Sequence, residues 1–202
     1  MRQPALFLDR DGTLIHPRHY PTRPEELVLY DGLAPELQRL REHGFRLVLI
    51  TNQSGLARGL FTDADLDRMH AHLLDEMRSL GAPLDAVYHC PHHPEGTVAE
   101  LAIECSCRKP EPGMLLRAAE DLDLDLASSW FVGDILDDVE AGNRSGCRTV
   151  LVDIGTESPP ASAASTLDAL RVIAAVEGLG GSVDLEYVPA PWLASPLPGA
   201  RL

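Results

Sequence analysis

The sequence predicts a Rossmann-like α/β fold in which a mainly parallel sheet is flanked by helices. Short β-branched or leucine-rich runs alternate with longer amphipathic stretches, a pattern typical of strands and crossover helices. The run FRLVLIT, residues 45–51, is apolar almost throughout, as expected of a strand buried on both faces. A length of 202 residues suits one hydrophobic core better than two.

The same alternation gives the order of the elements. The predicted strands cover residues 5–9, 45–51, 86–90, 130–133 and 148–152. The predicted helices cover residues 33–43, 63–80, 114–121, 136–144 and 167–176. The first of these helices carries leucines at helical spacing and stops at Gly44, a good C-terminal signal.

We expect one folded core over residues 1–155, with a linker and a terminal helix in residues 156–180 packed on it. Residues 181–202 are rich in glycine and proline and are predicted to form a loose tail. The segments between Asp11 and Thr51 and between Ser54 and Lys109 are filled by predicted helices, a strand and a cysteine-rich loop. They leave no room for a separate cap domain, so the site should be open and covered only by loops.

The charge balance excludes some classes of partner. The chain has 31 acidic and 17 basic side chains and a formal net charge of -14, which disfavours binding to nucleic acid or to an anionic membrane. No run approaches the roughly 18 apolar residues of a membrane span. The short apolar N-terminal run reaches Asp9 too soon for a secretory signal. We expect a cytoplasmic monomer whose partner is a small molecule.

Two carboxylates leave the first predicted strand together. Asp9 and Asp11 stand in FLDRDGTL, and Gly12 allows the chain to turn directly after them. Open parallel sheets bind ligands outside the carboxyl ends of their strands. This spacing lets one carboxylate attack phosphorus while the other works as acid and base. A solvated Asp-x-Asp-Gly turn is the alternative explanation.

The second strand also ends in polar groups. Thr51 is followed by Asn52, Gln53, Ser54 and Gly55, which offer a hydroxyl and several backbone N–H groups to phosphate oxygens. Taken alone, this segment is also an ordinary polar turn.

A third strand end, FVGD, places Asp134 at the same predicted edge, with Asp137 and Asp138 in the next turn. Three acidic clusters at three strand ends are hard to attribute to turn chemistry. Carboxylates this close repel one another unless a hard cation lies among them, and Mg²⁺ with oxygen ligands is the candidate.

The cysteine-rich loop, residues 90–107, supplies a tetrahedral set for Zn²⁺: Cys90, His92, Cys105 and Cys107. The alternative is three unconnected free cysteines, and His93 or His89 could replace His92. All four positions are filled by protein, so this zinc should be structural.

Such a zinc would fold the loop and hold Arg108 and Lys109 over the phosphate site. Cys147, outside the loop, is predicted to be a buried apolar residue.

Taken in order, FLDRDGTL, the strand ending in Thr51, Lys109 and VGDILDD resemble the four motifs of the haloacid-dehalogenase superfamily of phosphatases. The resemblance covers residues 5–155. It implies that Asp9 is the nucleophile that forms an aspartyl-phosphate, and that Asp11 protonates the leaving oxygen and later activates water. Thr51 and Lys109 would hold the transferring phosphoryl group.

The resemblance also implies a magnesium site. Its ligands would be Asp9, the backbone carbonyl of Asp11, and Asp134. Asp138 would support these ligands without binding the metal itself. The superfamily often has a basic residue after the metal-binding aspartate, where this chain has Ile135, so the hold on phosphate is expected to differ here.

Within the superfamily, the chain resembles one family in particular, the D-glycero-D-manno-heptose 1,7-bisphosphate phosphatases, which remove the 7-phosphate. The segments that carry this resemblance are the zinc loop, TNQSGLARG and CRKPEPGML. The implied substrate contacts, besides the catalytic residues, are Asn52, Gln53, Ser54, Arg58, Arg108 and the loop residues Arg18, His19 and Tyr20.

Two alternatives remain. Histidinol-phosphate phosphatases are close relatives, but they typically have an acidic residue at the position of Ser54 and a shorter zinc loop. A non-catalytic, zinc-stabilised phosphate-binding module would be expected to lack Asp9 or Asp11, and both are present.

The basic residues are strongly biased toward arginine, since sixteen are arginine and only Lys109 is lysine. A compact ammonium suits one crowded oxygen better than the planar fork of arginine does. In a chain of net charge -14, we expect Arg10, Arg58, Arg108 and Lys109 to form one local positive pocket.

Overall fold

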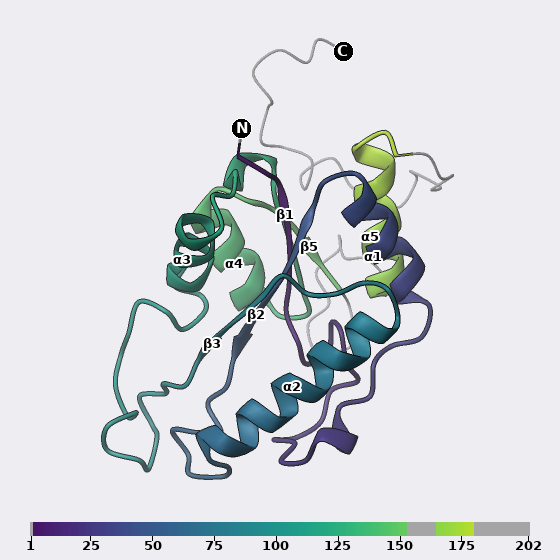
Figure 1. Ribbon diagram of the computed structural model, residues 1–202. Helices are drawn as coiled ribbons and strands as arrows, with labels where there is room; N and C mark the ends of the chain where they lie inside the picture. Colours follow the sequence, from purple (N-terminus) through teal and green to yellow (C-terminus); the bar gives the residue numbers. More distant parts are fainter. Residues whose placement is uncertain (1, 153–164, 180–202) are drawn as a thin grey trace.

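Five parallel strands form a single sheet in the order β3-β2-β1-β4-β5 in this computed structural model, which describes residues 2–152 and 165–179 (Figure 1). The strands are β1 Ala5–Leu8, β2 Arg46–Asn52, β3 Ala86–Cys90, β4 Trp130–Gly133 and β5 Arg148–Leu151. The predicted α/β class is confirmed, and every described strand pair is parallel.

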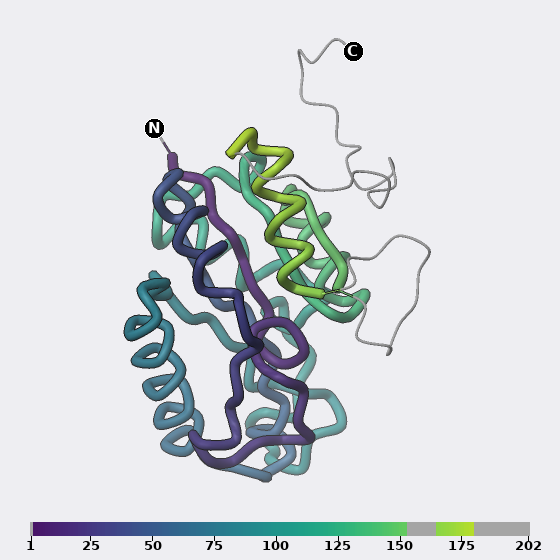
Figure 2. Tube along the Cα trace, turned by 90° about the vertical axis from the view of Figure 1, so that its right-hand side faces the viewer, coloured from purple at the N-terminus to yellow at the C-terminus, as the bar shows by residue number. Residues whose placement is uncertain are grey.

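Helices cover both faces of this sheet, which makes three layers (Figures 1 and 2). One face carries α1 Leu33–Glu42, α2 Asp63–Ser79 and α5 Thr166–Val176. The other carries α3 Gly113–Asp121 and α4 Leu136–Ser145. The predicted bounds of helices and strands are correct to within one residue at each end.

The alternation of side chains along β1 explains why its sequence is apolar without interruption. Leu6 and Leu8 join the core beneath α1, α2 and α5, while Ala5 and Phe7 join the core beneath α3 and α4. All four side chains are fully buried. The central strand of the sheet is therefore fixed by packing on both of its faces.

Two short 3-10 helices, Pro24–Glu26 and Leu126–Ser128, were not predicted. Three residues are too few to show a hydrophobic period, so the sequence pattern carries no signal for them.

The terminal helix α5 lies beside α1 and packs on the sheet (Figures 1 and 2). Trp130 on β4 donates from its indole nitrogen to Glu177 at 3.0 Å, and Arg148 on β5 lies 2.7 Å from the same carboxylate. The predicted tail, residues 181–202, and most of the predicted linker lie outside the described residues. No helix in the described part of the chain is long and apolar enough to span a membrane.

The topology places a crevice at the carboxyl end of β1. This strand lies between β2 and β4, and the helix that follows it covers one face while α3 and α4 cover the other. Open α/β sheets bind ligands at such a switch point. The backbone N–H of Asp9 donates to the carbonyl of Val132 at 3.0 Å, so Asp9 is fixed directly at this end of the sheet.

A histidine is buried close to this edge. His70 on α2 lies with its ring centroid 5.5 Å from that of His89 on β3. Burial, followed by the charge of Arg10 and the neighbouring His89, lowers the pKa of His70 to about 3. The folded protein therefore keeps His70 neutral well below the pH at which an exposed histidine gains its proton.

Replacing His70 by glutamine should flatten the acid dependence of stability. Between pH about 6.5 and about 3, the unfolded chain protonates this histidine and the folded chain does not, which removes up to about 1.4 kcal/mol of unfolding free energy per pH unit as pH falls. Urea titrations from neutral pH to about pH 5 should show a shallower loss for His70→Gln than for the unaltered protein.

The exposed His43 offers a matched control. His43→Gln should follow the unaltered protein across the same pH range. If the curve of His70→Gln is also parallel to that of the unaltered protein, the neutral buried state of His70 is refuted.

Candidate active site and metal-binding clusters

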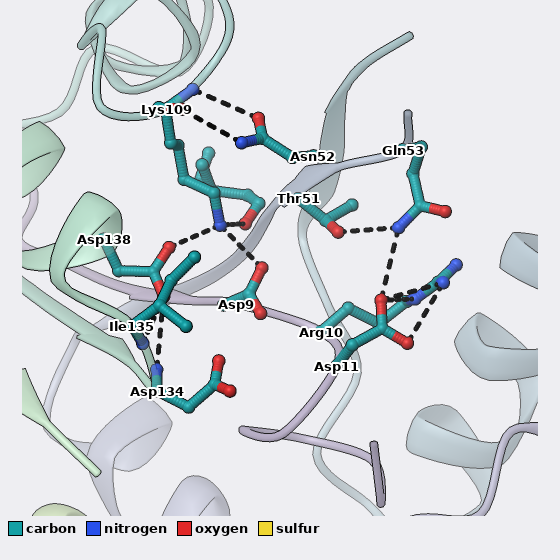
Figure 3. A network of polar contacts seen from close by, with 11 residues as sticks. Asp9, Arg10, Asp11, Thr51, Asn52, Gln53, Lys109, Asp134, Ile135 and Asp138 are labelled. Atoms are coloured by element: carbon teal, nitrogen blue, oxygen red, sulfur yellow. Dashed lines mark hydrogen bonds and ion pairs between the residues drawn. The ribbon is translucent and has the colours of Figure 1, made fainter. Parts of the chain in front are cut away.

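Lys109 lies at the centre of the polar groups at this edge (Figure 3). Its ammonium nitrogen is 2.6 Å from Asp9 Oδ1 and 2.6 Å from Asp138 Oδ1, and it donates to the carbonyl of Ile50 at 3.1 Å. Burial lowers the pKa of Lys109, but the carboxylates of Asp138 and Asp9 outweigh burial and raise it overall. The lysine is 2% exposed and stays charged, as a compact cation shared by three oxygens.

Asn52 holds the backbone that carries this lysine. Its side chain donates to the carbonyl of Lys109 at 3.1 Å and accepts from the N–H of Lys109 at 3.1 Å (Figure 3). The sequence predicted Asn52 as a substrate contact. In the structure, both ends of its side-chain amide are engaged by the backbone of Lys109. A two-sided pairing between distant segments leaves no signal in the sequence.

Three buried carboxylates converge beside Lys109. Ligand oxygens of Asp9, Asp134 and Asp138 lie within 4.8 Å of one another. Burial, followed by the charges of Asp9 and Asp138, raises the pKa of Asp134 to about 8. A hard divalent cation would relieve this crowding, so the donor set fits Mg²⁺.

Asp138 differs from the other two carboxylates. One of its oxygens pairs with Lys109, and the other accepts from the backbone N–H groups of Asp134 at 3.1 Å and of Ile135 at 3.3 Å. Its oxygens are thus engaged by protein, as expected of a residue that supports the metal ligands. Asp9 and Asp134 are the carboxylates that would hold Mg²⁺.

Asp11 points away from this cluster (Figure 3). Its carboxyl group accepts from Arg10 and, at 3.3 Å, from Gln53, whose amide also donates to the Thr51 hydroxyl at 2.8 Å. Burial raises the pKa of Asp11, and the Arg10 charge opposes this rise. The predicted catalytic residues therefore lie in two groups, with Asp9 and Lys109 in one, and Asp11 and Thr51 joined through Gln53 in the other.

Asp11 borders a pocket of about 210 Å³. The predicted substrate residues that line it are Arg18, His19, Tyr20, Asn52, Gln53 and Ser54. The hydroxyl groups of Tyr20 and Ser54 lie 3.4 Å apart, which brings the loop after β1 against the loop after β2. The structure thus gathers these residues around one cavity.

The four cations predicted to form one positive pocket do not all meet at one cavity. Arg10 is 1% exposed and paired with Asp11, and Lys109 is buried among carboxylates. Arg108 donates to the carbonyl of His92 at 3.3 Å, and Arg58 contacts His93 at 3.1 Å. Burial costs are lowest when each cation meets its own partner, and Arg10 thus lines a different cavity from the one that Arg108 and Lys109 share.

Arg108 borders a second, larger cavity of about 570 Å³. Lys109, Ser106 and Asp137 line the same cavity, which lies between the cysteine-rich loop and the start of α4. Arg108 therefore lies beside Lys109 at a cavity large enough to admit an anionic ligand.

Four side chains between the end of β3 and the start of α3 form a second group that could hold a metal ion, because the ligand atoms of Cys90, His92, Cys105 and Cys107 lie within 4.8 Å of one another. The sulfurs of Cys90 and Cys107 are 3.1 Å apart, and His92 Nδ1 is 3.3 Å from Cys107 Sγ. Three sulfurs and one imidazole fit tetrahedral Zn²⁺.

The structure also decides among the neighbouring histidines. His92 joins the three sulfurs, whereas His93 contacts Arg58 and His89 lies beside His70. Cys147, predicted to be a buried apolar residue, is 6% exposed and lies in the core beneath α3 and α4.

A fold of this kind with a buried Asp–Lys–Asp cluster defines a phosphatase of the haloacid-dehalogenase (HAD) superfamily, and comparisons with known proteins agree. The HAD-hydrolase-like family model matches residues 106–177. A putative HAD-like phosphatase from Mesorhizobium loti has a TM-score of 0.78 at 39% identity, covering 90% of this chain and 89% of that one.

Named relatives indicate which family within the superfamily the chain resembles. The D-glycero-β-D-manno-heptose-1,7-bisphosphate 7-phosphatase of Yersinia pestis is 44% identical over 153 residues, covering 75% of this chain and 81% of the relative. The enzyme of that name from Escherichia coli K12 is 42% identical over 158 residues, covering 78% and 83%. The D,D-heptose 1,7-bisphosphate phosphatase of B. bronchiseptica, complexed with magnesium and phosphate, has a TM-score of 0.72 at 31% identity, covering 86% of this chain and 99% of that one.

The chain therefore belongs to the same HAD family as these heptose bisphosphate phosphatases, and it is a hydrolase that acts on phosphate esters.

Removing one ligand of the cysteine cluster should release zinc and destabilise the protein. Cys105→Ser should lower the zinc content from about one equivalent per chain, and thermal unfolding should occur at a lower temperature because structural zinc contributes directly to folding. Metal analysis of the purified proteins, with and without chelator, measures the first effect.

Cys147→Ala is the matched control, since this cysteine is buried outside the cluster. It should keep its zinc whatever it loses in stability. A purified, unaltered protein without zinc, or a Cys105→Ser protein of unchanged thermal stability, would contradict the structural-zinc assignment.

Proposed function

We propose that this protein is a Mg²⁺-dependent phosphomonoesterase that removes the 7-phosphate of D-glycero-D-manno-heptose 1,7-bisphosphate through an aspartyl-phosphate. The observation that best supports this reaction type is the buried Asp9 carboxylate at the end of β1, which lies 2.6 Å from the Lys109 ammonium and is grouped with Asp134. The names of the relatives at 42–44% identity support the choice of substrate.

In the first half-reaction, a carboxylate oxygen of Asp9 attacks phosphorus and the bond from phosphorus to the sugar oxygen breaks. Asp11 gives its proton to that oxygen, which leaves as an alcohol. Lys109 and the Thr51 hydroxyl hold the transferring phosphoryl group. In the second, Asp11 takes a proton from a water that attacks phosphorus, which releases inorganic phosphate and restores Asp9.

Mg²⁺, held by Asp9, Asp134 and the backbone carbonyl of Asp11, would neutralise charge on the phosphoryl oxygens when bound. The D,D-heptose 1,7-bisphosphate phosphatase of B. bronchiseptica, whose structure contains magnesium and phosphate, supports this cofactor. Zn²⁺ in the cysteine cluster would act structurally, by fixing the loop that ends at Arg108 and Lys109.

The sugar would occupy the cavity bordered by Asp11, Tyr20 and Ser54. Arg108 and Arg58, on the side of the zinc loop, are our candidates for the distal phosphate. We propose that the protein works as a cytoplasmic monomer on this small molecule.

Asp9→Asn should abolish phosphate release. The amide keeps the shape of the carboxylate but is a poor nucleophile, so turnover should fall on the order of 10³-fold or more. Phosphate release measured with and without Mg²⁺ tests both the nucleophile and the cofactor.

The exposed Asp31 supplies the control, and Asp31→Asn should turn over normally. Full turnover by Asp9→Asn would refute the covalent mechanism. Metal-independent release by the unaltered protein would refute the role of Mg²⁺.

A panel of substrates tests the identity of the sugar phosphate. The value of kcat/KM should be highest for one anomer of heptose 1,7-bisphosphate, and at least about ten-fold lower for a monophosphate because the contacts of a charged group are lost. Histidinol phosphate belongs in the same panel. Equal or faster hydrolysis of histidinol phosphate would overturn the proposed substrate and leave the reaction type intact.

A further inference from the structure

Arg10 stands between the two catalytic aspartates and has an unusual environment. Its guanidinium donates through Nε to Asp11 Oδ2 at 3.0 Å and through Nη2 to Asp11 Oδ1 at 3.2 Å, a two-point contact with one carboxyl group (Figure 3). The side chain is 1% exposed, and among the described residues its third nitrogen, Nη1, has no hydrogen-bond partner.

Neighbouring residues on an extended strand point to opposite sides, so this contact requires a turn. The carbonyl of Arg10 accepts from the N–H groups of Leu14 and Ile15, both at 3.0 Å, and Gly12 has a φ of 85°. A side chain larger than hydrogen is disfavoured at such a φ. The loop thus closes on itself and brings the two side chains together.

A buried guanidinium is costly for the fold. Removing it from water costs several kcal/mol, which a two-point contact with a carboxylate offsets only in part. An apolar side chain would fill the same space without that cost. The charge is therefore better explained by what it does to Asp11 than by packing.

The contact also fixes where Asp11 points. The Gln53 amide, which is 4% exposed, adds a third hydrogen bond to the carboxyl group at 3.3 Å. With Arg10 on one side and Gln53 on another, the carboxyl group stays at the border of the cavity lined by Tyr20 and Ser54. It stays apart from the Asp9, Asp134 and Asp138 cluster.

We propose that Arg10 is a positioning residue for Asp11: its planar fork fixes the carboxyl group toward the leaving oxygen of the substrate. This inference rests on the proposed function, which makes Asp11 the acid. As the bond from phosphorus to oxygen breaks, the proton moves from Asp11 to that oxygen, and Asp11 becomes a carboxylate. The contact with the guanidinium strengthens at that moment, because it now joins two opposite charges.

Two substrates that differ in their leaving group separate this role from a general structural one. The sugar alkoxide of heptose 1,7-bisphosphate needs a proton to leave, whereas the phenolate of 2,4-dinitrophenyl phosphate is a stable anion and needs none. The value of kcat/KM reports the steps up to departure of the leaving group. It therefore isolates the acid role of Asp11 from its later role as a base.

Arg10→Met removes the charge and keeps much of the length of the side chain. We expect kcat/KM for the sugar bisphosphate to fall about 10- to 100-fold, part of the 10²- to 10⁴-fold that a general acid contributes. The loss on the dinitrophenyl ester should be at least about ten-fold smaller. Arg10→Lys keeps the charge without the fork, so its loss on the sugar bisphosphate should be intermediate.

Arg78→Met is the matched control, because Arg78 is exposed and pairs with the nearby Asp75. It should leave both kcat/KM values unchanged. If Arg10→Met lowers kcat/KM by the same factor for both substrates, the proposal is overturned, since a structural role or a direct contact with phosphate affects both esters alike. Unchanged values for both substrates would overturn it as well.

Thermal unfolding shows whether each variant is folded. If Arg10→Met does not fold, the test uses Arg10→Lys instead, by comparing its loss of kcat/KM on the sugar bisphosphate with its loss on the dinitrophenyl ester. Unaltered protein that hydrolyses neither ester would refute the proposed function itself. That outcome is distinct from an active protein whose preference between the two esters does not depend on Arg10.

Discussion

The buried ammonium of Lys109 is the contact on which the catalytic edge depends. It joins Asp9 after β1, Ile50 on β2 and Asp138 in the first turn of α4. Three carboxylates this close would repel one another, and a buried ammonium without anions would cost several kcal/mol. Each charge therefore makes the burial of the others possible, and the loop that carries Lys109 must dock for the edge to form.

The loop that carries Lys109 is held at two places. Cys105 and Cys107 lie a few residues before Lys109 and belong to the cluster with Cys90 at the end of β3. On the other side, Asn52 pairs with the backbone of Lys109. A metal in the cysteine cluster would thus act on catalysis at a distance, by setting the position of the lysine without touching the phosphoryl group.

The sequence predicts much of this site because parallel strands end at one edge. Asp9 and Asp134 directly follow recognisable strands, and Thr51 lies near the end of another, so their gathering follows from topology. The pairing of charges cannot be predicted in the same way. Arg10 was expected to join a local positive pocket and instead binds Asp11, because such choices depend on burial and on distances of a few tenths of an ångström, which no residue pattern encodes.

Arg10 and Lys109, the buried cations among the described residues, show why this arginine-rich chain needs one lysine. Lys109 meets oxygens from three different elements, which a small ammonium with three donors can satisfy and a rigid planar fork cannot. Arg10 meets both oxygens of one carboxyl group, which the fork fixes in plane and an ammonium would hold at a single point. In the proposed mechanism, the nucleophile Asp9 therefore has a point charge that can be shared with a phosphoryl oxygen, while the acid Asp11 has a partner that fixes its direction.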